Sequence, residues 1–250
     1  MIRVFPTLRA GVDLFLSRFP LMMGALLIVM AVRVGVGLIP EVPYLGTLVR
    51  SAVSLILLAP LTVGQSWIAL RVVRGEPASI RDLFRGYSRW GTLVGISLMT
   101  NITVGVGTLL LIVPGIVWGL ALMFAPVAAL DAQTPDGSQR KLGVFDALQE
   151  SQGMTKGIKG ALFGISLILG LPMAASLVVT LLSRFAPGVE IPGWVSQLLP
   201  LLTGVLFMGP IGATSFMIIY DKIAGLARQA YEDSSGDDSS AFDVELPTNE

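Results

Sequence analysis

The stretch that decides the fold is SIRDLFRGYSRWGTLVGISLMTNITVGVGTLLLIVPGIVWGLALMFAPVAAL (Ser79–Leu130). Its opening segment, Ser79–Trp90, is amphipathic, because apolar residues follow a helical period on one side and arginines recur on another. Ser79 and Asp82 have the spacing of a capping box, which marks a helix start. Two apolar runs then flank the turn formers Pro114-Gly115. The pattern predicts a helix lying on a membrane surface, followed by a hairpin that crosses the bilayer twice.

The composition of the whole chain favours an integral membrane protein. Of its 250 residues, 53% are hydrophobic and only 14% are charged, whereas soluble domains carry about 25% charged residues. Six runs are long and apolar enough to span a bilayer. They are Leu21–Ile39, Thr47–Leu70, Gly91–Val113, Gly115–Leu130, Ile158–Leu182 and Trp194–Tyr220.

The basic residues between these runs and at their ends predict the orientation. Lys and Arg are enriched in cytoplasmic loops, and here nearly all of them fall on one side: Arg3, Arg9, Arg18, Arg71, Arg74, Arg81, Arg85, Arg89, Arg140, Lys141, Lys156, Lys159, Lys222 and Arg228. Only Arg184 falls on the other side. We therefore expect both termini in the cytoplasm, and the run before residue 39 to be a retained first span.

Weaker copies of the amphipathic segment and the hairpin lie on either side of Ser79–Leu130. The segment Gly91–Leu98 shares its pattern with Gly160–Leu167, and Asp13–Phe15 precedes Asp82–Phe84 by the same number of residues. Each returning span also carries a small residue, proline and an aliphatic residue: Ala59-Pro60-Leu61, Ala125-Pro126-Val127 and Gly209-Pro210-Ile211. We expect these prolines to kink their helices, with neighbours satisfying the freed carbonyls.

These matches predict an all-α membrane protein of three pseudo-repeats, each an interfacial amphipathic helix plus a transmembrane hairpin. The repeats cover about 1–75, 76–135 and 136–231, and together form a six-span membrane domain over 1–231. Residues 232–250 are acidic and rich in Ser, which predicts a disordered cytoplasmic tail. The tail is either a solvated end or a docking segment for a cytoplasmic partner.

The residue types present exclude much chemistry. The chain has no Cys and no His, which removes disulfides, thiolate nucleophiles, imidazole catalysis and most zinc sites. No acid lies inside a predicted span, and no phosphate loop or nucleophile elbow is visible. We expect no catalytic residue, no metal site and no cofactor, and hence no enzyme; a membrane-embedded enzyme is the least favoured interpretation.

Two sets of residues are candidate binding sites. Arg33 and Arg50 lie inside apolar runs, where a charge is expensive and marks a functional candidate. They either extend to the headgroups, bind an anion or a lipid headgroup, or pair with a residue such as Glu41. The second set, predicted to contact the membrane surface, is Arg81, Arg85, Arg89 and Trp90. Its place between spans favours anionic lipid over nucleic acid as the partner.

Two motifs, the first of which overlaps the end of this stretch, resemble a known family. LLLIVPGIVWGLALMFAPVAALD, which ends at Asp131, is followed by Ala147-Leu148-x-x-Ser151-x-x-Met154-Thr155-Lys156-Gly157. These motifs are similar to the YciC-like bacterial inner-membrane proteins, over roughly Leu83–Leu169. The resemblance implies a six-span protein of the bacterial plasma membrane. Such proteins often carry the label of a glycerophosphoryl diester phosphodiesterase membrane domain, but that activity belongs to an attached domain whose His residues this chain lacks.

The resulting functional hypothesis is a non-enzymatic integral membrane protein that organises or regulates membrane and envelope components. The alternative is a transporter or channel for a small anionic or lipid-like solute, with Arg33 and Arg50 near its outer mouth. Parallel two-span units fit the inverted repeats of many transporters less well.

Overall fold

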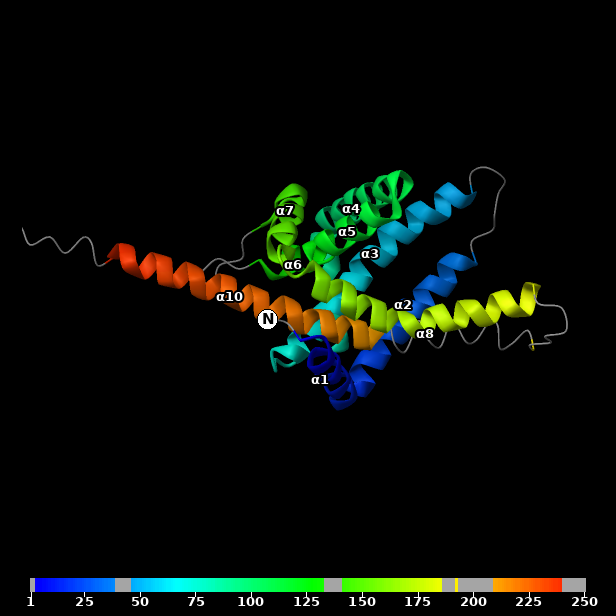
Figure 1. The fold of residues 1–250 in the computed structure, drawn as a ribbon, viewed down its shortest axis with the longest axis horizontal. Coiled ribbons are helices and arrows are strands. Elements are labelled where there is room, and N and C mark those ends of the chain that lie inside the picture. Colours follow the sequence, from blue (N-terminus) through cyan, green and yellow to red (C-terminus); the bar gives the residue numbers. More distant parts are fainter. Residues whose placement is uncertain (1–2, 39–45, 133–140, 186–191, 193–208, 240–250) are drawn as a thin grey trace, which may run out of the picture.

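The computed structural model describes residues 3–38, 46–132, 141–185, 192 and 209–239, and all regular structure within those ranges is helical (Figure 1). The elements, in chain order, are α1 (Val4–Ser17), α2 (Phe19–Gly37), α3 (Gly46–Val73), the 3₁₀ helix η1 (Ile80–Arg89), α4 (Trp90–Leu110), α5 (Ile112–Leu122), α6 (Ala125–Asp131), α7 (Val144–Thr155), α8 (Lys159–Phe185) and α10 (Gly212–Ser239).

Five segments of the described chain are long and apolar enough to cross a membrane: Phe19–Gly37, Val49–Val73, Ile80–Leu110, Ile112–Asp131 and Lys159–Val179. They coincide with the first five predicted spans. Most of the sixth, Trp194–Tyr220, lies outside the described residues, and α10 contains only its end. Thus the architecture is that of an all-helical protein with several membrane-length helices.

The helices divide into an inner and an outer set. The main hydrophobic core joins residues of α3, α6 and α10, among them Leu70, Ala128 and Ile219. We call these the inner helices. The outer helices, α2, α4 and α8, are more exposed. In their most apolar stretches 28%, 17% and 24% of the residues are buried, against 50% in that of α3. Apolar side chains on the outer helices therefore suit contact with lipid tails rather than water.

Helix η1 packs directly against the backbone of α3, and glycines make this possible. A Cβ atom on Gly64 of α3 would lie 1.8 Å from the carbonyl oxygen of Leu83, and one on Gly86 of η1 would lie 2.2 Å from that of Pro60. Leu83 is fully buried in the contact. The expected start of this helix is confirmed, because the Ser79 N–H donates to Asp82 Oδ2 at 2.8 Å.

The three arginines of η1 do not share one face, contrary to the expectation from their spacing. A 3₁₀ helix has about 3.0 residues per turn, so positions four apart are rotated by roughly a third of a turn. Arg81 is exposed, Arg85 lies over the ring of Trp67 at 4.8 Å, and Arg89 donates to the carbonyl of Ala129. The residues that do align are three apart, Phe84, Tyr87 and Trp90.

Neighbouring side chains satisfy the backbone carbonyls before the proline inside α3, as expected. Pro60 has no N–H for the carbonyl of Ile56, and Trp90 Nε1 donates to that oxygen at 3.2 Å. Tyr87 donates to the carbonyl of Leu57 at 2.9 Å. Both donors belong to the η1–α4 junction, so the segment that docks on α3 also satisfies the carbonyls next to its proline.

A break separates α5 from α6, just before Pro126. Here the buried Ser151 of α7 donates to the carbonyl of Ala121 at 2.8 Å and accepts from the N–H of Phe124 at 3.2 Å. The hydroxyl of Thr155 also lies 3.4 Å from the Ala121 carbonyl. Helix α7 therefore docks on the interrupted helix as η1 docks on α3.

The first helix, α1, packs on α10, near Pro210. The buried Thr214 hydroxyl lies 2.9 Å from the carbonyl of Gly11, and a Cβ on Gly11 would lie 2.3 Å from Ser215 Oγ. Segments from opposite ends of the described chain thus lie side by side, as Figure 1 also shows.

We call α1, η1 and α7 the short helices. The first residue of each of them also contacts an outer helix. A Cβ on Gly24 of α2 would lie 3.5 Å from Ile80, one on Gly95 of α4 would lie 2.8 Å from Val144, and one on Gly164 of α8 would lie 3.6 Å from Val4. Gly95 and Gly164, each four residues after another glycine, thus bring short helices close to outer helices.

Two junctions between a short helix and an outer helix are built alike. Ser17-Arg18-Phe19 and Ser88-Arg89-Trp90 have the same order of residue types. Arg18 has φ −124° and ψ 31°, and Arg89 has φ −124° and ψ 33°. In both, the serine donates to the carbonyl three residues earlier. Asp13 and Asp82, aligned from sequence, hold different places: Asp82 caps η1, whereas Asp13 lies within α1.

Helix α10 continues beyond the place where the tail was predicted to begin. It runs through Glu232 to Ser239, so the segment 232–239 is helical, and residues 240–250 lie outside the described ranges. Ala, Arg and Gln, which favour helices, occupy the turn just before Glu232.

Candidate functional site

Arg74 stands at the carboxyl end of α3, where a glycine stops the helix. Gly75 has φ +70°, a conformation that glycine adopts without strain. The N–H of Gly75 donates to the carbonyl of Val72 and that of Glu76 to the carbonyl of Arg71, at 3.1 and 2.9 Å. This pair of bonds is a Schellman motif. It fixes the end of α3 and hence the origin of the Arg74 side chain.

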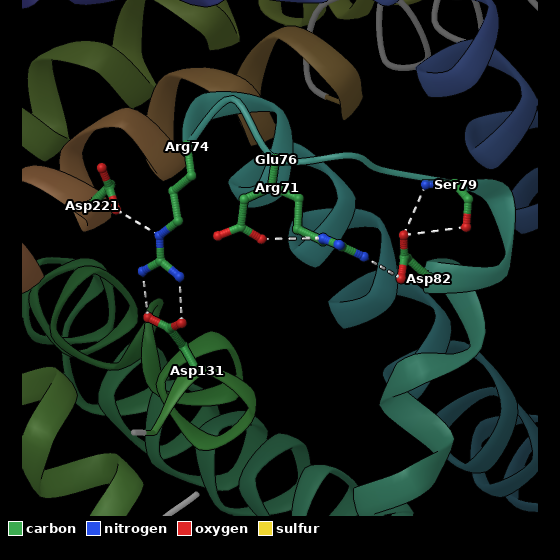
Figure 2. Close-up of polar contacts among 7 residues, drawn as sticks. All are labelled: Arg71, Arg74, Glu76, Ser79, Asp82, Asp131 and Asp221. Carbon is green, nitrogen blue, oxygen red and sulfur yellow. Dashed lines mark hydrogen bonds and ion pairs between the residues drawn. The ribbon is translucent and has the colours of Figure 1, made fainter. Parts of the chain in front are cut away.

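Arg74 joins the three inner helices (Figure 2). Its Nη1 and Nη2 donate to the two oxygens of Asp131, the last residue of α6, at 2.6 and 2.7 Å. Its Nε donates to Asp221 of α10 at 2.8 Å. Tyr220, also on α10, donates to Asp131 Oδ2 at 3.0 Å. We call Arg74, Asp131, Tyr220 and Asp221 the arginine cluster.

The cluster is largely shielded from solvent. The side chain of Asp131 is 1% exposed and that of Arg74 is 15% exposed, while Asp221 is open at 36%. Burial disfavours the charge of Arg74, but its hydrogen bonds to Asp131 and Asp221 outweigh this, and the pKa of Arg74 is raised. Arg74 is thus held permanently charged, in the bidentate geometry that carboxylates favour.

The position of Asp131 makes the arginine necessary. A carboxylate at the carboxyl end of a helix faces the negative end of the helix dipole, while a cation there is favoured. Arg74 supplies that cation to Asp131 and, at the end of its own helix, also meets a favourable dipole. Removing Arg74 would leave the buried carboxylate of Asp131 without a counter-charge, which is strongly destabilising, whereas Arg74 without Asp131 would still pair with Asp221.

A second ion-paired arginine, Arg71, lies beside the arginine cluster (Figure 2). Arg71 lies 2.8 Å from Asp82 and 3.3 Å from Glu76. Because Asp82 also caps η1, Arg71 connects the end of α3 to the start of the helix that docks on it. These two arginines, one turn apart, therefore tie α3 to η1, α6 and α10.

The arginine cluster is an ion-pair arrangement that can join helices. The carboxylates of the arginine cluster face a guanidinium group, and no group of three or more metal-ligating side chains occurs among the described residues. A buried, bidentate ion pair spanning three helices can hold them in one arrangement. It can also release them if a partner or ligand competes for Arg74.

The residues predicted as sites lie elsewhere. Arg33 is exposed on α2 and Arg50 is half-buried on α3, towards the hairpin end of these two helices; Glu41 is outside the described residues. The second predicted set lies on η1 and at its junction with α4: Arg81, Arg85, Arg89 and Trp90. Sequence reasoning missed the arginine cluster, although Asp131 offered a signal, since an acid directly follows the apolar, Ala-rich Ala125–Leu130.

No protein-family model matches this chain, and no curated protein or solved structure matches it either. The resemblance to YciC-like proteins therefore stays a prediction.

Proposed function

We propose that the chain is a ring of three units within a membrane. The units are α1–α2–α3, η1–α4–α5–α6 and α7–α8–α10. Three contacts support this: η1 packs on α3, α7 on α6, and α1 on α10. Each short helix thus docks on the inner helix of the unit before it, near its proline, and the first unit docks on the last. The contacts of Gly24, Gly95 and Gly164 with the next short helix follow the same cyclic order.

The function that this arrangement supports best is that of a non-enzymatic anchor, which organises or regulates components of the bacterial plasma membrane and envelope. The observation that carries the proposal is the arginine cluster, which joins all three inner helices and meets α10 at Asp221. Beyond Asp221, α10 runs on to Ser239 and extends away from the other helices (Figure 1). A fixed membrane body would thereby present an acidic arm to a cytoplasmic partner.

The anchor hypothesis requires one conformation, and this can be measured. The chain has no Cys, so spin labels can be placed at Leu38→Cys and Leu109→Cys, which are exposed at the ends of α2 and α4. In lipid vesicles we expect a single narrow distance distribution. The variant Arg74→Ala should broaden it, which checks the sensitivity of the measurement. Two well-separated populations in the unmodified background would contradict a fixed anchor.

Transport of a small anionic or lipid-like solute is the second candidate, because Arg33 is exposed within an apolar helix. Flux of radiolabelled phosphate and of a fluorescent lipid into reconstituted vesicles would test it. For an anchor we expect equal, negligible flux in the unmodified protein, Arg33→Ala and Arg50→Ala. Flux that falls in the arginine variants would favour transport.

The proposed orientation places both termini in the cytoplasm. It is supported by the distribution of basic residues. A cysteine at Leu226, exposed on α10, should react with a membrane-impermeant maleimide only after the cells are opened. A cysteine at Leu109 should react with the same reagent in intact cells whose outer membrane has been permeabilised. The reverse pattern would overturn the orientation and leave the fold unaffected.

A further inference from the structure

A polar pocket of about 610 Å³ lies where η1 meets α4. Its wall is formed by the junction of the two helices and by the residues that precede α7: Tyr87, Ser88, Arg89, Trp90, Gly91, Thr92, Lys141 and Leu142. The pocket therefore sits between the second and third units. It is separate from the arginine cluster.

The lining of the pocket suits an anion. Arg89 and Lys141 bring two cationic side chains to it from different parts of the chain, and no acidic residue is among the described lining residues. The amino end of α4 opens onto the pocket at Gly91 and Thr92, and the side chain of its N-cap residue, Arg89, does not cap it. Helix amino ends add positive potential. Trp90 and Tyr87 contribute the aromatic groups that prefer the headgroup layer of a membrane.

An apolar surface continues from the pocket along α4. Leu98, Ile102 and Val106 recur at helical spacing and are 43%, 49% and 47% exposed. At about 100° per residue, Gly91 lies on the same side of the helix as these three. A ligand that fits both parts would combine an anionic head with an apolar tail.

We propose that this pocket binds the phosphate headgroup of an anionic phospholipid, whose acyl chains lie along Leu98, Ile102 and Val106. Arg89 and Lys141 provide the charge, and Trp90 lies at the level of the glycerol. The proposal rests on the membrane location given under the proposed function. It differs from a general attraction of basic residues to the surface, because one lipid is held at one place between two units.

Native mass spectrometry of the detergent-purified chain, titrated with phosphatidylglycerol, tests this. Lys141→Gln is the central variant, because Lys141 is exposed and its loss should leave the fold intact. Lys156→Gln, a second exposed lysine outside the pocket, is the matched control. One basic residue near a membrane surface contributes enough to change the affinity about fivefold. We therefore expect Lys141→Gln to weaken the first lipid-binding step about fivefold and Lys156→Gln to leave it unchanged.

Two further arms identify the ligand. Phosphatidylcholine, whose headgroup has no net charge, should bind more weakly than phosphatidylglycerol and should not distinguish Lys141→Gln from the control. Inorganic phosphate at millimolar concentration should not displace the lipid; full displacement would assign the pocket to a soluble anion and overturn the proposal. Equal effects of Lys141→Gln and Lys156→Gln would also overturn it. Neither outcome would affect the spin-label test of the anchor, so the two proposals can fail separately.

Discussion

At the scale of single residues, Asp131 has the strongest claim to hold the molecule together. It is the most buried carboxylate of the arginine cluster, with a side chain 1% exposed, and it receives three hydrogen bonds from Arg74 and Tyr220. Asp221 accepts one hydrogen bond from the same arginine and is 36% exposed. Solvent screens an exposed pair, so the two aspartates should differ in their effect on stability.

We expect Asp131→Asn to lower the free energy of unfolding by about 3 kcal/mol, the cost of breaking a buried ion pair. Asp221→Asn should cost about 1 kcal/mol or less. Thermal unfolding in detergent, followed by the loss of helical circular dichroism, would measure both. A double variant, Arg74→Met with Asp131→Leu, should recover part of the loss, because an apolar pair leaves no buried charge. Equal losses in the two single variants would contradict the role assigned to Asp131.

At the scale of elements, the decisive contact is that of η1 with α3, where two backbones meet without side chains between them. Glycine to alanine within a helix normally stabilises it by up to about 1 kcal/mol. At Gly64 the added Cβ would lie 1.8 Å from a backbone oxygen of Leu83. Since a backbone atom cannot move aside as a flexible side chain can, the sign of the effect should reverse.

Gly64→Ala should therefore destabilise the protein by about 1–3 kcal/mol, as other overpacked contacts do. Gly105→Ala is the matched control, because a Cβ there meets nothing within 4 Å, and it should be neutral or slightly stabilising. Thermal midpoints of both variants in the same detergent give the comparison. If Gly64→Ala melts no lower than Gly105→Ala, η1 does not pack on α3 as described.

The same elements explain how far the sequence could predict the structure. Long apolar runs predicted five membrane-length helices correctly, and Ser79 with Asp82 predicted the start of η1, because both signals are local. The prediction that the three arginines of η1 share one face was wrong. The sequence pattern does not distinguish 3.0 from 3.6 residues per turn over so short a segment. The arginine cluster was missed because its charges lie far apart in the chain, and Arg74 already had an explanation as a cytoplasmic loop residue.

At the scale of the whole molecule, the proposed ring closes through the contacts of α1 with the third unit. Val144 meets Gly95 between neighbouring units, and the Cβ that Gly95 lacks would lie 3.9 Å from Cβ of Val144, within the range of disulfides. Val4 meets Gly164 in the corresponding way, but between the first and the last unit. An open chain of three units would preserve the former contact and lose the latter.

Cysteine pairs in this naturally Cys-free chain can distinguish the two cases. The pairs are Gly95 with Val144, Val4 with Gly164, and, as a control, Val4 with Val144, each treated with a short thiol cross-linker in membranes. A protease site inserted between residues 133 and 140 separates the members of every pair. After cleavage, a closed ring should keep the fragments joined for the first two pairs and not for the control. Joining for Gly95 with Val144 alone would show that the chain is open between α1 and α8, and the ring would have to be abandoned.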